Sequence, residues 1–128
     1  MRINLNSVLV QDQESALRFY TDVLGFEKKL DLPAGEGRWL TVVSPEEPNG
    51  TELLLEPNLN PAALTYQQAL FEAGIPLTSF AVDEIGAEYE RLGALGVRFR
   101  SEPANVGTAI VAVFEDTCGN LIQIHQVL

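Results

Sequence analysis

The sequence predicts an α+β fold made of two copies of one β-α-β-β-β module, each a curved sheet backed by a single helix. The main observation is a repeat that carries the start and the end of a helix together. Asp83 follows Asp12 by 71 residues, and Leu95-Gly96 follows Leu24-Gly25 by the same 71 residues. Self-similarity at a fixed spacing indicates a duplicated supersecondary unit. Because one sheet with one helix leaves a sheet face uncovered, we expect the two modules to pair and close a common cavity.

A second pair of glycines extends the repeat toward the end of each module. Gly119 follows Gly50 by 69 residues, which aligns the predicted strand 51–56 with residues 120–125. The 128 residues suit one domain that buries its own core without metal or disulfide. We therefore expect a single domain over residues 1–128, with module one at about 1–58, a linker helix at about 59–74 and module two at about 75–128.

The composition is that of an ordinary globular protein with a strong acidic excess. Eighteen acidic and eight basic side chains give a net charge of −10, which opposes binding to nucleic acid or to an anionic membrane. Cys118 is the only cysteine, so an internal disulfide and a four-cysteine zinc site are excluded. The N-terminus does not resemble a signal peptide and no apolar run reaches membrane-spanning length. We expect a cytoplasmic protein.

Local patterns predict the elements of the first module in order. Residues 3–10 alternate and contain β-branched side chains, which favours a strand. Asp12 is a predicted helix N-cap, apolar residues then recur at three- and four-residue spacings, and Gly25 stands at the expected left-handed C-terminal cap. The remaining predicted elements are strands at 26–32, 38–43 and 51–56, a loop at 33–37 and a turn at 44–50.

The second module repeats this order after a short predicted helix at 64–73. Asp83 is the predicted cap of a helix that ends at Gly96. In the late turn, Asp116 is expected to accept hydrogen bonds from the backbone, and Gly119-Asn120 to adopt positive φ. The other predicted elements are strands at 77–82, 97–100 and 108–114, a loop at 101–107 and a last strand after Asn120.

The last strand places two polar side chains on one face. Alternation puts Leu121, Gln123 and His125 on one side and Ile122 and Ile124 on the other. His125 is the only histidine, and so the only side chain that titrates near neutral pH when unperturbed. It is a candidate general base. The alternative interpretation is a strand-end residue that packs on its neighbour.

The motifs in this order resemble one known family, the vicinal oxygen chelate superfamily of glyoxalases, bleomycin-resistance proteins and extradiol dioxygenases. The resemblance covers the whole chain and rests on the segments 10–12, 16–20, 24–26, 82–83, 95–97 and 116–120. It implies two βαβββ modules that form a partly closed, U-shaped sheet with helices on the outside, usually in a homodimer. Members with this fold differ widely in function, so the resemblance is more specific for fold than for reaction.

The resemblance also implies four metal-ligand positions, one on each of four strands. They fall on Leu5, Leu54, Leu77 and Gln123, where metal enzymes of the family usually carry histidine or carboxylate. A register shift of one residue pair would replace Leu54 with Glu52 or Glu56 at its position. Leucine has no donor atom, and a lone glutamine amide is a poor anchor for a divalent ion. We therefore expect no metal and no other cofactor, and with the metal the usual Lewis-acid chemistry is lost.

The first functional hypothesis is a metal-free protein that sequesters a small molecule, similar to the bleomycin-resistance branch. The expected cup is lined by Leu5, Leu54, Leu77, Gln123 and Trp39. Trp39 follows a Gly-rich loop and is a candidate for stacking on a flat ligand. Glu52 and Glu56 flank Leu54 on one strand face and are candidates for an anionic wall against a cationic ligand.

Two alternatives stay open. The first is a lyase, an isomerase or a dioxygenase-like enzyme, with a rebuilt site that uses His125 and Glu52 or Glu56. The second is an interaction module without a small ligand. Trp39 then lies at a rim or a dimer interface, and the two glutamates lie on a solvated strand face.

Overall fold

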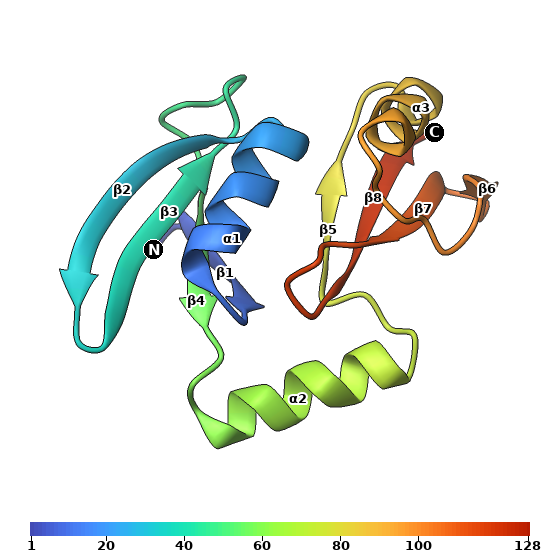
Figure 1. Cartoon of the computed structure of the whole chain (residues 1–128). Coiled ribbons are helices and arrows are strands. Elements are labelled where there is room, and N and C mark those ends of the chain that lie inside the picture. Colours follow the sequence, from blue (N-terminus) through green and yellow to red (C-terminus); the bar gives the residue numbers. More distant parts are fainter. The chain divides into compact units, whose positions relative to one another are not determined.

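The computed structural model describes all 128 residues and contains two compact units, Met1–Leu64 and Thr65–Leu128. Each unit has a four-stranded sheet, with strand orders β1-β4-β3-β2 and β5-β8-β7-β6 (Figure 1). In both sheets the first strand pairs in parallel with the last, and every other pairing is antiparallel. The predicted α+β fold of two duplicated modules is confirmed.

The first unit contains one helix against one sheet face. Its elements are β1 (Leu5–Val10), α1 (Gln13–Arg18), the π-helical turn η1 (Phe19–Val23), β2 (Glu27–Ala34), β3 (Gly37–Val43) and β4 (Glu52–Pro57). Helix α1 packs on β3 and β4. The buried core between them contains Val8, Val10, Leu40, Val42 and Leu55 from the sheet and Ala16, Phe19 and Tyr20 from the helical segment.

The second unit follows the same plan after a longer helix. Helix α2 (Pro61–Glu72) runs across the boundary between the units. It is followed by β5 (Thr78–Ala81), α3 (Ile85–Ala94), β6 (Ala104–Asn105), β7 (Ala109–Glu115) and β8 (Leu121–Val127). Helix α3 packs on β7 and β8, and the core includes Ile85, Leu92, Ala112, Phe114, Ile122 and Ile124. None of the helices is long and apolar enough to cross a membrane.

The two module helices begin differently although their sequences repeat. Asp12 caps α1 as predicted, since its carboxylate accepts the Ser15 N–H at 2.9 Å. The predicted cap at Asp83 is wrong, because α3 begins at Ile85 after Glu84. The Ile85 N–H donates instead to the Gln126 side chain of β8 at 2.9 Å, so an acceptor from a distant strand replaces the local cap.

Two strand predictions are also wrong. Residues 97–100 form only an isolated bridge, from Phe99 to Phe114, and the short strand β6 lies inside the segment predicted as a loop. In the first unit, β2 continues through Pro33 to Ala34, where a loop was expected. Proline is tolerated there because β2 is the edge strand of its sheet, so the missing N–H breaks no ladder between two strands.

The turn before β8 is held by a buried polar network. Asp116 accepts the N–H groups of Cys118 at 2.8 Å and Asn120 at 3.0 Å, as predicted. Gln67 of α2 donates to the Cys118 carbonyl and to the Asn120 side chain. Gly119 has the predicted positive φ of 101°, but the second residue with positive φ is Thr117, at 62°, and not Asn120.

Candidate functional site

One face of the first sheet is turned away from α1. Arg38 reaches Glu14 of α1 at 2.7 Å, so alternation directs its neighbour Trp39 to the opposite face. The register pairs Thr41 with Leu54, which places Leu54 on the same face as Trp39. Glu52 and Glu56, two residues on either side of Leu54, share that face as well.

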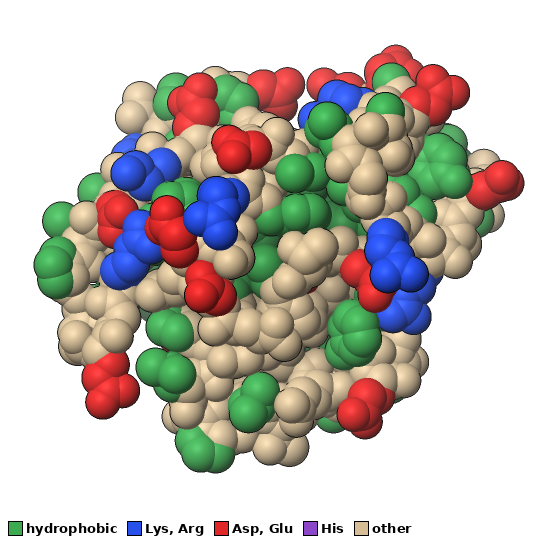
Figure 2. Space-filling model, viewed as in Figure 1, with side chains coloured by type: hydrophobic (Ala, Val, Ile, Leu, Met, Phe, Trp, Pro, Cys, Tyr) green, Lys and Arg blue, Asp and Glu red, His purple; other side chains and the backbone are tan.

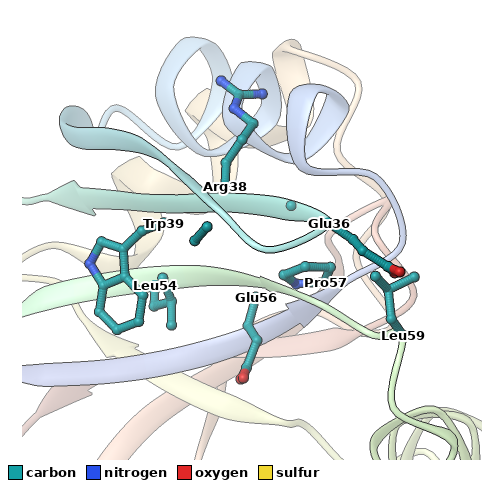
Figure 3. Close-up of a pocket in the computed structure, with 9 residues that line it drawn as sticks. Glu36, Arg38, Trp39, Leu54, Glu56, Pro57 and Leu59 are labelled. Atoms are coloured by element: carbon teal, nitrogen blue, oxygen red, sulfur yellow. The ribbon is translucent and has the colours of Figure 1, made fainter.

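A pocket of about 340 Å³ opens on this face. It is lined by Ala34, Glu36, Gly37, Arg38, Trp39, Leu54, Glu56, Pro57 and Leu59. In Figure 3 the Arg38 guanidinium points away from Glu56, so Arg38 contributes its backbone to the pocket. The structure thus brings together three residues that the sequence predicted for a ligand site, Trp39, Leu54 and Glu56.

The pocket is mostly apolar and carries two carboxylates, Glu36 and Glu56. Glu56 is exposed and forms no ion pair. Glu52 lies on the same face but does not line the pocket, and its carboxylate accepts the Thr41 hydroxyl at 2.8 Å. Leu5 pairs with Glu52 in the sheet and is 39% exposed, also outside the pocket. The sequence did not predict that Glu36, at the tip of the β2–β3 hairpin, and Leu59, after β4, would line the pocket, because loop residues show no periodicity.

On the α1 side of the sheet, ion pairs connect β3 to α1 and to β2. The Arg38 guanidinium contacts Asp31 and Glu14, each at 2.7 Å. The hydrogen bonds that Arg38 donates to Asp31, and then to Glu14, raise the pKa of Arg38, and the bonds that Asp31 accepts from Arg38 lower the pKa of Asp31. On the face of the molecule shown in Figure 2, acidic side chains are interspersed with basic and exposed apolar ones.

A polar cluster lies on the second sheet, on the face turned away from α3. Gln126 points toward α3, so Gln123 and His125 point to the other face by alternation. Gln123 donates to the Ser79 hydroxyl at 3.0 Å, and Ser79 lies 2.7 Å from His125 Nδ1. The Ser79 hydroxyl therefore joins the two polar side chains, and whether it donates to His125 Nδ1 or accepts from it depends on the tautomer of the imidazole. Ser79 was missed by sequence reasoning, since its role appears only when β5 pairs with β8.

The positions that the resemblance assigned to metal ligands do not fit a divalent ion. Leu5, Leu54 and Leu77 carry hydrocarbon side chains, which leaves the Gln123 amide oxygen as the single donor atom among the four positions. No three His, Cys, Asp or Glu side chains gather into a group that would hold a metal. Glu52 and Glu56 belong to the first unit and His125 to the second, and the rebuilt site that would combine them stays a prediction.

Comparison with known proteins identifies the family. The profile of the Glyoxalase/Bleomycin resistance protein/Dioxygenase superfamily matches residues 2–124. The chain belongs to this superfamily. The resemblance predicted from the sequence is therefore confirmed. Within the superfamily, the chain is 56% identical to the uncharacterized protein YurT of Bacillus subtilis (strain 168), over 98% of this chain and 99% of that protein.

Two solved structures share the fold of this chain closely. UcmS2 is 34% identical with a TM-score of 0.83, covering 98% of this chain and 97% of that one. TnmS3, described as an antibiotic binding protein from Streptomyces sp. CB03234, is 30% identical with a TM-score of 0.80 over 100% of this chain and 97% of that one. At least one solved structure that resembles this chain is thus described as an antibiotic binding protein.

Proposed function

We propose that this superfamily member binds and sequesters a small organic molecule without a metal ion. The observation that carries the proposal is the pocket on the first sheet, in which Trp39 and Leu54 form apolar walls next to Glu56. The family resemblance implies a metal-ligand position at Leu54, and because leucine has no donor atom, this surface suits contact with an apolar ligand better than coordination.

The lining indicates a flat ligand with a positive charge. Trp39 offers an indole ring that is 39% exposed, enough to stack on a planar group. Glu36 and Glu56 supply negative charge at the same pocket, and the net charge of −10 raises the local concentration of cations. The likeness to TnmS3 supports ligands of the antibiotic type.

The proposal extends to assembly, compartment and the other predicted contacts. We infer a cytoplasmic homodimer, as is usual for the superfamily, and analytical ultracentrifugation tests the dimer directly. Further ligand contacts are proposed at Leu5 and Glu52 of the first unit and, separately, at Leu77, Gln123 and His125 of the second unit. No nucleic-acid or membrane partner is proposed, in keeping with the acidic surface.

Trp39 is the only tryptophan, so its fluorescence reports on the pocket alone. A thermal-shift screen of aromatic cations and antibiotics should find compounds that raise Tm and quench Trp39 with one saturable site. Glu56→Gln should weaken the binding of a cationic compound by a factor of about 1.4 to 5, since an exposed charge pair contributes about 0.2–1 kcal/mol. Glu46→Gln is the matched control, because it removes an equal charge from an exposed loop position outside the pocket. Equal weakening by both variants would mean that the pocket is not the site.

The metal-dependent alternative is tested on the same protein. Metal content is measured after purification without chelator, in the wild type and in His125→Ala. The binder proposal predicts less than one tightly bound divalent ion per chain in both. One ion per chain that is lost with His125→Ala would overturn the proposal in favour of an enzyme. If no compound stabilises the protein and no metal is found, the interaction module is favoured.

A further inference from the structure

The pocket opens at a split in the first sheet. Strands β3 and β4 pair at only two positions, Thr41 with Leu54 and Val42 with Leu53. Beyond Thr41, β3 continues to Gly37 while β4 continues to Pro57, and no ladder joins the two. The pocket lining takes residues 37–39 from one strand and residues 54, 56 and 57 from the other. The unpaired stretch of the sheet is therefore the part that forms the pocket.

A single side chain joins the separated strands from the α1 side. The Gln13 amide donates to the Arg38 carbonyl at 2.7 Å and to the Leu55 carbonyl at 2.8 Å. Its carbonyl oxygen accepts the Arg38 N–H at 3.0 Å. Gln13 thus provides partners for three backbone groups, the Arg38 N–H and C=O and the Leu55 C=O, at a place where no ladder joins β3 and β4. The bridge is half-buried, so water does not freely replace it.

Only a side chain with both a donor and an acceptor makes these three bonds. Glutamate at position 13 keeps the acceptor for the Arg38 N–H. It places a negatively charged oxygen, in place of a donor, next to the carbonyl oxygens of Arg38 and Leu55, which repels them. Methionine keeps the length and flexibility of glutamine and loses all three bonds. The geometry next to the bridge is tight, because a Cβ added at Gly37 would lie 3.1 Å from the Gln13 side-chain oxygen and 3.2 Å from the Pro57 ring.

We propose that Gln13 is a positioning residue that sets the spacing of β3 and β4 and thereby the shape of the ligand pocket. It touches no ligand itself and acts through the backbone of Arg38, next to Trp39, and of Leu55, next to Leu54 and Glu56. The consequence for binding rests on the proposed function. The effect of Gln13 on the spacing of the strands in the ligand-free protein does not depend on that function. Strand spacing and ligand affinity are therefore measured in separate experiments.

The ligand-free test compares Gln13→Met with Asp12→Ala. Asp12→Ala weakens the same helix by removing its cap but leaves the Gln13 bridge in place. Gln13→Met should speed hydrogen exchange of the Arg38 amide and raise acrylamide quenching of Trp39, because the strand that carries both is released from β4. Asp12→Ala should leave both readouts close to wild type at matched stability. Equal changes in the two variants would overturn the proposal, since the effect would then be a general loss of stability.

Two further variants keep the test decisive. Gln13→Glu keeps an acceptor for the Arg38 N–H, so the Arg38 amide should exchange as slowly as in wild type. Acrylamide should still quench Trp39 more than in wild type, because the bonds to the two carbonyl groups are lost. Gly37→Ala crowds the bridge from the strand side and should raise Trp39 quenching without altering residue 13. If Gln13→Met does not fold, Gln13→Glu decides the question, and wild-type quenching of Trp39 in that variant would count against the proposal.

The ligand arm uses proflavine, a planar cationic acridine, as a probe of the pocket. Gln13→Met should bind proflavine about tenfold more weakly than wild type, because the pocket is less well preorganised. A tenfold loss corresponds to the net contribution of about one strong hydrogen bond. Asp12→Ala should bind proflavine with wild-type affinity. Wild type that binds neither proflavine nor any screened cation would contradict the proposed function, while the exchange and quenching results would still decide the role of Gln13. Tight proflavine binding that is unchanged in Gln13→Met would contradict the positioning role alone.

Discussion

Thr117 is the only non-glycine residue with positive φ, at 62°, in the turn that Asp116 organises. A β-branched residue in this region is strained by about 1–2 kcal/mol, because its Cβ approaches the backbone. Glycine relieves the strain but loses about 0.5–1 kcal/mol through the greater freedom of the unfolded chain. Thr117→Gly should therefore raise the free energy of unfolding by about 0.5–1 kcal/mol, as measured by urea denaturation.

The matched control for this prediction is Thr51→Gly. Thr51 is also an exposed threonine next to a strand, but its φ is not positive. It should lose about 0.5–1 kcal/mol of stability for the same entropic reason. A loss of stability in both variants would show that the turn at Thr117 stores no strain.

Single residues of the candidate site were predictable where their own chemistry stands out. Trp39 and Glu56 were found because an aromatic ring after a Gly-rich loop and an acid on a strand face are visible in the sequence, and both line the pocket. Gln13 and Ser79 were not predicted. Their partners lie at least 25 and 44 residues away along the chain, and no local pattern reports such contacts.

At the level of elements, the two modules repeat the aspartate before and the glycine after their helices at the same spacing, but the helix starts are capped by different interactions. Both helices are followed by a glycine with positive φ, Gly25 and Gly96, as the spacing predicted. The starts differ, since Asp12 caps its helix with its own side chain and α3 is capped by Gln126 from β8. Local capping was therefore predictable from the sequence, and capping by a distant strand was not.

This difference gives a three-variant prediction. Asp12→Ala should cost about 1 kcal/mol of unfolding free energy, the usual effect of losing an N-cap. Asp83→Ala should stay within about 0.5 kcal/mol of wild type, because its side chain caps nothing. Gln126→Ala should cost about 1 kcal/mol, because the Ile85 N–H loses its acceptor. Urea unfolding of the three variants is the measurement, and an Asp83→Ala loss equal to that of Asp12→Ala would contradict this assignment.

At the scale of the whole molecule, the acidic charge should govern which solutes approach the pocket. With a net charge of −10 and two carboxylates at the pocket, caesium should quench Trp39 more than iodide does. Each quenching constant is normalised to N-acetyltryptophanamide at the same ionic strength. The preference should shrink as salt rises toward 0.1 M, where the screening length falls to about 10 Å.

The pocket's own contribution is separated from the overall charge by two variants. Glu56→Gln should reduce the preference for caesium more than Glu46→Gln, although both remove one negative charge. Equal reductions would assign the preference to the net charge of the molecule alone. Iodide quenching at least as strong as caesium quenching in the wild type would contradict the anionic character of the pocket.

The sequence by itself determined the duplicated α+β fold and the superfamily. These follow from local and periodic information: alternation, helix caps, turn residues and a spacing that recurs. The tertiary structure decided which elements were irregular and which side chains meet. The strand expected at 97–100 was reduced to one bridge, the cap of α3 came from Gln126, and the pocket formed where β3 separates from β4 around Gln13. All three depend on partners far away in the chain, whose positions are set by packing and by the need to pair each buried backbone group.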